Sequence, residues 1–150
     1  MANRWMLWIF VFAFLAGGCA TLTIEPVDYS WGIESVLAVA SDGTVTGAPK
    51  TLSFNAGQLF VQELGRVPRT GKPTIRVIRN RQGYYFVTAP LFKHVYVFSP
   101  GIERLKLSRK ILVDADGMKR PAFNQRDPFI QLVNGKQVLM LNEKGISGGK

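Results

Sequence analysis

The sequence predicts a mainly β fold, either a small antiparallel sandwich or a small barrel, with at most one short helix. Two observations lead to this class. Short runs of aliphatic and aromatic residues recur along residues 33–145, and turn residues such as Asp-Gly and Asn-Gly separate them. A chain of 150 residues suits a single domain of this kind.

In the first part of the domain, residues 33–40 and 50–54 have the composition of strands, and an Asp-Gly pair between them favours a tight turn. The stretch NAGQLFVQELG then predicts a short helix with Asn55 as its N-cap and Gly65 as its stop. A strand also fits this stretch. As a helix it would bury a face made of Leu59, Phe60 and Leu64.

The middle of the domain has the strongest strand signals. After a loop over residues 66–73, the runs at 74–78 and 84–89 are typical of a hairpin with Gly83 in its turn. Residues 91–98 are nearly all apolar or aromatic, which predicts a strand that is buried on both faces.

Residues 104–114 alternate between apolar and polar side chains, which is the period of a strand with one buried face. The apolar face would carry Leu105, Leu107, Ile111 and Val113. The polar face would carry Arg104, Lys106, Ser108 and Lys110. Arg109 breaks the alternation, so it either points inward or marks a β-bulge.

The end of the domain contains a turn, a loop and a hairpin. DADG forms the turn at residues 114–117, and residues 118–128, with two prolines, predict a loop. Asn134-Gly135 between two aliphatic runs is a strong hairpin signal. We expect residues 146–150 to form a flexible tail.

The first twenty residues have a different character. Arg4 precedes an uncharged apolar run at residues 5–15, small residues follow, and Cys19, the one cysteine of the chain, comes next. This order is typical of a secretory signal, and LAGGC resembles the lipobox of bacterial lipoproteins. A membrane-spanning helix is the alternative, but it needs about 20 apolar residues.

The resemblance covers residues 1–20 alone and implies a lipid-anchored protein of the cell envelope. Residues 1–18 would be a lipoprotein signal peptide, and Cys19 would receive a diacylglyceryl thioether and begin a lipidated tether over residues 19–32. The membrane would be a partner through this lipid. Ala20 resembles an outer-membrane address, on the periplasmic face, if the host has two membranes.

Few residues suit catalysis or metal binding. The single histidine, His94, falls on an apolar strand, where we expect a packing role, and zinc sites need three or four ligands. Asp114 and Asp116 begin like a calcium loop, but the later acidic ligands are missing, so we interpret them as turn residues. We therefore expect no enzyme activity, no metal and no cofactor.

Charge is unevenly distributed along the chain. From Cys19 to Gly65 one base, Lys50, accompanies five acids, whereas from Arg66 onward 17 bases accompany five acids. Arginine matches phosphate and carboxylate through two parallel donors. The candidate anion-binding or partner-binding residues are Arg66, Arg69, Lys72, Arg76, Arg79, Arg81, Arg104, Lys106 and Lys110.

Such a surface would bind an envelope polyanion, such as lipopolysaccharide or peptidoglycan, or an envelope protein, and the secretory signal argues against nucleic acid. A basic face that only confers solubility is the alternative. We thus expect a non-catalytic envelope lipoprotein that binds or braces another envelope component. An accessory subunit of a secretion, pilus or transport assembly, docked through a strand edge, is a second hypothesis. A cell-wall hydrolase is a third, which the lack of a recognisable nucleophile or acid pair disfavours.

Overall fold

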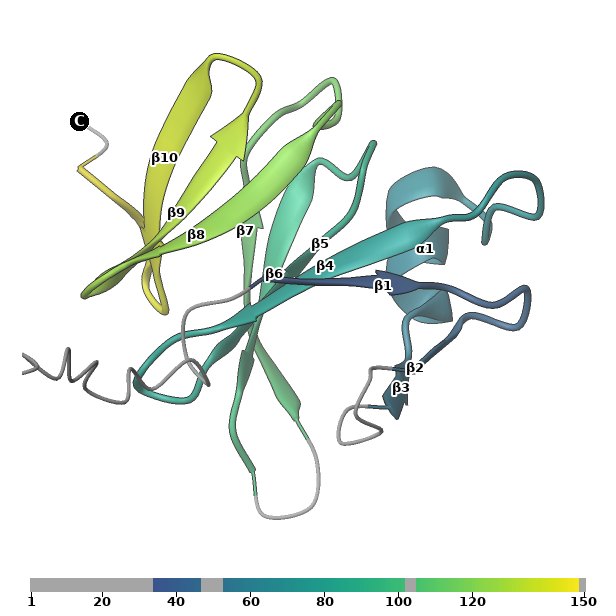
Figure 1. Cartoon of the computed structure of the whole chain (residues 1–150), viewed down its shortest axis with the longest axis horizontal. Helices are drawn as coiled ribbons and strands as arrows, with labels where there is room; N and C mark the ends of the chain where they lie inside the picture. The colour runs from purple at the N-terminus through teal and green to yellow at the C-terminus, as the bar shows by residue number, and fades with distance from the viewer. Residues whose placement is uncertain (1–33, 47–52, 102–104, 149–150) are drawn as a thin grey trace, which may run out of the picture.

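The computed structural model describes residues 34–46, 53–101 and 105–148 and confirms a mainly β fold of antiparallel sheets with one short helix (Figure 1). Our predictions for residues 1–32, Cys19 among them, and for Arg104 lie outside these described residues.

The larger sheet contains five strands in the order β1-β4-β5-β6-β7, and each neighbouring pair is antiparallel. The strands are β1 (Ser35–Ala38), β4 (Thr74–Arg79), β5 (Tyr85–Thr88), β6 (His94–Ser99) and β7 (Lys106–Leu112). In β6 the successive residues Val95, Tyr96 and Val97 are all buried. Both faces of this strand are therefore covered, as its apolar sequence predicts.

The second sheet contains four antiparallel strands in the order β11-β10-β9-β8. They are β8 (Pro121–Arg126), β9 (Phe129–Asn134), β10 (Gln137–Asn142) and β11 (Gly145–Ser147). The predicted hairpin joins β9 to β10, but its two turn residues are Gly135 and Lys136, one position later than the predicted Asn134-Gly135 pair. A short ribbon of β2 (Thr44–Thr46) and β3 (Ser53–Asn55) leads into the helix α1 (Gly57–Leu64).

The helix α1 covers one face of the five-stranded sheet. Phe60 packs edge-on against Phe92 with ring centroids 4.9 Å apart, and Phe92 packs edge-on against Tyr96 of β6 at 6.2 Å. Leu59 is buried and Leu64 packs against the core, so the predicted apolar helix face is confirmed.

The ends of α1 agree with the predicted stop and differ by one residue at the predicted cap. Gly65 adopts the left-handed conformation, with φ 74°, and its N–H donates to the carbonyl of Val61. Ala56 is the cap residue and offers no side-chain hydrogen bond. The side chain of Asn55, one residue before the cap, accepts the Gly57 N–H at 2.7 Å, so the predicted residue still supplies a hydrogen bond to the start of the helix.

The four-stranded sheet packs on the opposite face of the larger sheet. Val77 of β4 pairs with Val87 of β5, which pairs with Tyr96 of β6, so Val77 lies on the same face of the sheet as Tyr96, the face that α1 covers. Neighbouring residues of a strand point to opposite faces, so Arg76 lies on the other face. Arg76 forms an ion pair with Glu34, whose other oxygen accepts the N–H of Phe123 in β8 at 2.9 Å. This contact joins the two sheets, and the buried side chains of both belong to one core.

The structure corrects the predicted loop over residues 118–128, because residues 121–126 form β8. Pro121 is the first residue of this strand, and β8 lies at the edge of its sheet among the described residues. A proline is tolerated at such a place because its nitrogen need not donate to a neighbouring strand. The predicted tail is also corrected, since residues 145–147 pair with β10.

The structure corrects the predicted faces of β7. Leu105 and Leu107 are 37% and 46% exposed, whereas Ile111 is buried. Val97 pairs with Arg109 but Phe98 pairs with Leu107, so Ser108 is an extra residue and the predicted bulge is confirmed. An extra residue shifts the remaining side chains to the other face, and Leu107 consequently leaves the buried side.

Candidate functional site

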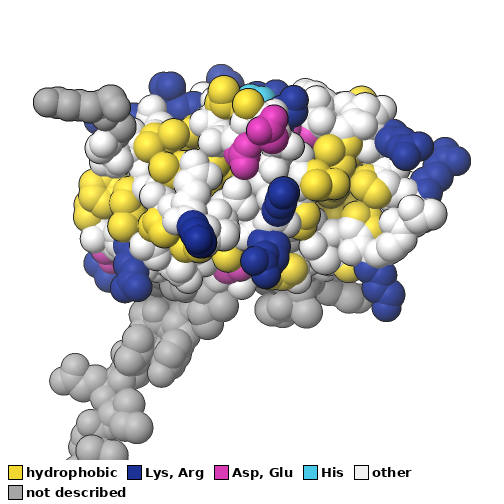
Figure 2. Space-filling model, turned by 90° about the horizontal axis from the view of Figure 1, so that it is seen from above, with side chains coloured by type: hydrophobic (Ala, Val, Ile, Leu, Met, Phe, Trp, Pro, Cys, Tyr) yellow, Lys and Arg dark blue, Asp and Glu magenta, His cyan; other side chains and the backbone are white. Residues whose placement is uncertain are grey.

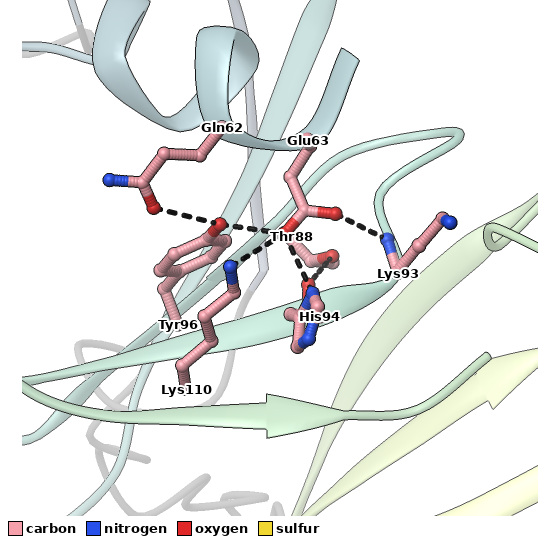
Figure 3. Close-up of polar contacts among 7 residues, drawn as sticks. All are labelled: Gln62, Glu63, Thr88, Lys93, His94, Tyr96 and Lys110. Carbon is pink, nitrogen blue, oxygen red and sulfur yellow. Dashed lines mark hydrogen bonds and ion pairs between the residues drawn. The ribbon is translucent and has the colours of Figure 1, made fainter. Parts of the chain in front are cut away.

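The most connected polar group that the structure describes is the carboxylate of Glu63, in the last turn of α1. Its side chain is only 1% exposed and points from the helix onto β6 and β7 (Figure 3). An acidic residue near the C-terminal end of a helix is disfavoured by the helix dipole. Glu63 therefore depends on partners from the sheet.

Four groups of the sheet side surround this carboxylate. Oε1 accepts a hydrogen bond from the Tyr96 hydroxyl at 2.6 Å and lies 2.8 Å from His94 Nδ1. Lys110 Nζ, from β7, is 3.7 Å from the same oxygen. Oε2 accepts the backbone N–H of Lys93 at 2.7 Å. We call Glu63 with Lys93, His94, Tyr96 and Lys110 the Glu63 network.

The surroundings keep Glu63 ionised. Burial by itself raises the pKa of Glu63, but the hydrogen bonds from Tyr96, from the Lys93 N–H and from His94 lower it by more, so the pKa lies below its ordinary 4.5. Burial raises the pKa of Tyr96 well above its ordinary value, and the adjacent Glu63 carboxylate raises it further. The pair is thus a carboxylate and a neutral phenol at physiological pH.

This chemistry fits a structural clamp better than an acid or base catalyst. A general acid–base group needs a pKa close to the working pH and access to a substrate. Glu63 has a lowered pKa, and both of its oxygens accept hydrogen bonds from within the protein. The Glu63 network holds α1 against β6 and β7.

The sequence singled out His94 but not Glu63. The expected packing role of His94 is refined by the structure, since its ring nitrogen contacts Glu63 and its backbone carbonyl accepts the Thr88 hydroxyl at 3.0 Å. Two features of the sequence bear on Glu63: it lies near the C-terminal end of the predicted helix, where an acidic side chain is disfavoured, and it is next to the apolar Leu64. Neither feature identifies the partners, which come from residues about thirty positions away.

The predicted basic residues do not gather on one surface. Arg66, Arg69 and Lys72 are exposed in the loop after α1. Arg76 and Arg79 lie on opposite faces of β4, where Arg79 stacks over the Tyr85 ring at 5.5 Å. Figure 2 shows Lys and Arg side chains distributed over one face of the molecule, singly and in small groups, with uncharged surface between them.

Three of the candidates make ion pairs inside the protein. Arg76 pairs with Glu34, Arg81 with Asp127, and Lys110 with Glu63. The Arg81 pair is largely exposed, and such pairs contribute little to stability. The other two connect separate elements of the fold, so these residues have structural roles in addition to any role in binding.

Replacing Arg76 by glutamine is expected to lower the free energy of unfolding by about 1–3 kcal/mol, because Glu34 would keep a mostly buried carboxylate without its cation. Urea unfolding followed by circular dichroism measures this change. Arg66→Gln, in an exposed loop, is the matched control and should change stability by less than about 0.5 kcal/mol. Equal effects of the two substitutions would contradict the structural role of Arg76.

The strand β7 is exposed along most of its length and carries two of the candidate residues. Every residue of β7 except Ile111 is exposed, Lys106 and Lys110 among them. Arg109, which the sequence marked as an irregularity, is a third exposed cation on this strand. The structure thus brings together three cations and the exposed leucines on one strand at the edge of the sheet.

Other possible sites offer little chemistry. A shallow hollow beside α1 is lined by uncharged residues, namely Asn55, Gly57, Gln58, Val61, Gln62 and Val67. Among the described residues no three His, Cys, Asp or Glu side chains converge as a metal site would require. Asp114 accepts the N–H of Asp116 at 3.0 Å, as in an ordinary turn.

Within residues 34–46, 53–101 and 105–148, none of the helices has the length and apolar character needed to span a bilayer. The fold and the site therefore define an antiparallel β domain with one clamped helix and one exposed basic strand. Comparison of the chain with protein-family models, curated proteins and solved structures finds no match.

Proposed function

We propose that this protein is a non-catalytic lipoprotein of the bacterial cell envelope. A lipid on Cys19 would anchor it to a membrane, on the periplasmic face of the outer membrane in a two-membrane host, and its β domain would bind or brace another envelope component. The order of a basic residue, an apolar run, small residues and Cys19 in LAGGC carries the anchoring part of this proposal.

The binding part is supported by the character of β7. This edge strand carries three cations, Lys106, Arg109 and Lys110, and two exposed leucines, Leu107 and Leu112. Charged residues alone would be an ordinary way to protect a sheet edge. The leucines are unusual in that position, because exposed apolar side chains gathered on one element are typical of interaction sites. The saturated Glu63 network favours binding over catalysis.

Replacing Cys19 by serine is expected to move the protein from the membrane fraction to the soluble fraction of the cell envelope, because the thioether cannot form and the acyl chains that hold a lipoprotein are lost. Fractionation of cells that express each form measures this change. Mass spectrometry of the mature wild-type N-terminus should find a diacylglyceryl group on Cys19. An unmodified Cys19 in a protein that stays in the membrane would overturn the lipoprotein proposal.

An accessory subunit of an envelope assembly, docked through a strand edge, is the second candidate; among the described strands β7 lies at the edge of the five-stranded sheet. Crosslinking in living cells followed by mass spectrometry distinguishes the two. An assembly subunit would yield one or two proteins in stable ratio, and a surface-binding lipoprotein would yield lipid or wall fragments.

A further inference from the structure

We propose that the projecting end of the β6–β7 hairpin rests on the surface of an anionic phospholipid bilayer. This inference rests on the proposed function, because the bilayer is the one to which Cys19 would tether the chain. The projecting end consists of residues 98–101 and 105–109, and Figure 1 shows it extending beyond the other strands, at the bottom of the view.

The first support is the apolar surface of the projecting end. Leu107 pairs directly with Phe98, and paired residues share a face of the sheet. Phe98 is half-buried, while Leu107 is 46% exposed and Leu105 is 37% exposed. Phe98 and Leu107 therefore place apolar side chains on one face of the projecting end, and the exposed Leu105 lies two residues before Leu107.

The second support is charge. Lys106 and Arg109 are exposed on the same part of the strand. Lys110 follows on the same strand, and among the described residues 98–101 and 105–112 these three cations accompany no acid. Apolar side chains flanked by Lys and Arg are the composition of interfacial membrane-binding segments, and the cations complement anionic headgroups.

The edge of β7 is less suited to accept another strand. The bulge at Ser108 interrupts the regular spacing of backbone groups, and a lysine stands on each side of it. Bulges and lysines are common devices that prevent pairing at sheet edges. Contact through the side chains at the projecting end therefore fits β7 better than contact through its backbone, and a bilayer surface needs only side chains.

The length of the connection to the anchor permits this contact. Residues 20–33 separate Cys19 from the described domain, and fourteen residues span at most about 50 Å when fully extended. A tether of this length keeps the domain near the bilayer at high effective concentration. A contact made by a few apolar side chains and a few cations is then sufficient to orient the domain.

The test places a polarity-sensitive fluorophore on Leu107→Cys in the mature lipoprotein, reconstituted in phosphatidylcholine vesicles with or without phosphatidylglycerol. Cys19 is the only native cysteine and its thiol would be alkylated, so the label reaches only the introduced residue. We expect a blue shift and quenching by spin-labelled acyl chains, several-fold stronger with phosphatidylglycerol. Lys106→Gln combined with Arg109→Gln should remove this dependence on phosphatidylglycerol.

The control is the same label at Val138→Cys, because Val138 is 52% exposed on β10 in the other sheet. It should stay accessible to an aqueous quencher in both kinds of vesicle. Equal aqueous quenching at the two sites in anionic vesicles would overturn the inference. Burial of the Leu107 site without vesicles, increasing with protein concentration, would overturn it in favour of pairing between copies. Mass spectrometry of Cys19 in the same sample shows separately whether the lipoprotein proposal holds.

Discussion

Replacing Glu63 by alanine is expected to lower the free energy of unfolding by about 3 kcal/mol or more, because it removes one side of a buried charged network and leaves the other side in place. The N–H of Lys93 would lose its acceptor, and the hydroxyl of the buried Tyr96 would keep only its long contact with Gln62 Oε1, at 3.4 Å. The substitution would also release the last turn of α1 from β6 and β7. Urea unfolding of the variant and the wild type measures the loss.

A matched control comes from the same helix. Gln58 is exposed on α1 and is not part of the Glu63 network, so Gln58→Ala tests the effect of shortening a polar side chain in this helix. It should change stability by less than about 0.5 kcal/mol. A loss below about 1 kcal/mol for Glu63→Ala would contradict the clamp.

The lowered pKa of Glu63 gives this stabilisation a definite dependence on pH. With the folded pKa below the ordinary 4.5 of the unfolded chain, the unfolded state binds more protons between these two values. The contribution is therefore fully present above pH 4.5 and is lost as pH falls through the folded pKa. Glu63→Gln should be less stable than the wild type at neutral pH, and its stability should fall less steeply in this acidic window.

Local patterns predicted those elements whose structure depends on nearby residues. The β9–β10 hairpin and the stop at Gly65 each use a glycine at a positive φ that few other residues adopt, and both are confirmed, although the turn residues are Gly135 and Lys136 rather than Asn134 and Gly135. Residues 121–126 were predicted as part of a loop because of Pro121 and Pro128. The sequence does not show that β8 lies at the edge of its sheet, where a proline is tolerated. The exposure of Leu107 depends on a bulge that the sequence located only to within a residue.

The candidate site was less predictable because its contacts are distant in the sequence. Arg76 has the composition of a binding residue, yet its partner, Glu34, lies 42 positions away. Glu63 carried no catalytic motif, and only folding brings His94 and Lys110 to it. Charge composition therefore predicted a basic chain, but it did not show that Arg76 and Lys110 have acidic partners within the fold.

Replacing Gly117 by alanine is the second substitution for which we expect a large loss of stability, about 3 kcal/mol or more. Gly117 has φ +90°, where an L side chain is strained, and a Cβ there would lie 2.6 Å from the carbonyl oxygen of Leu91. This backbone contact has no room to relax. Leu91 donates its N–H to the carbonyl of Met118 at 2.7 Å, and the Met118 N–H donates to the carbonyl of Phe92 at 2.9 Å.

The expected loss is large because these two bonds close one end of the core. Met118 and Phe92 are both fully buried, and Phe92 is the ring on which Phe60 of α1 packs. Separating the loop at Gly117 from Leu91 would expose this end of the core and weaken the packing of Phe60, in α1, on Phe92. The Glu63 network begins at Lys93, next to Phe92, so the two expected losses should not be additive.

Gly71→Ala is the control that separates strain from steric overlap. Gly71 has φ +83°, close to that of Gly117, but a Cβ there would meet nothing within 4 Å. It should therefore lose only the cost of the left-handed backbone, about 1–2 kcal/mol. Thermal or urea unfolding of the two variants measures the difference. Equal losses would mean that the contact between Gly117 and Leu91 does not hold this end of the core closed, whereas an excess loss in Gly117→Ala measures that contact directly.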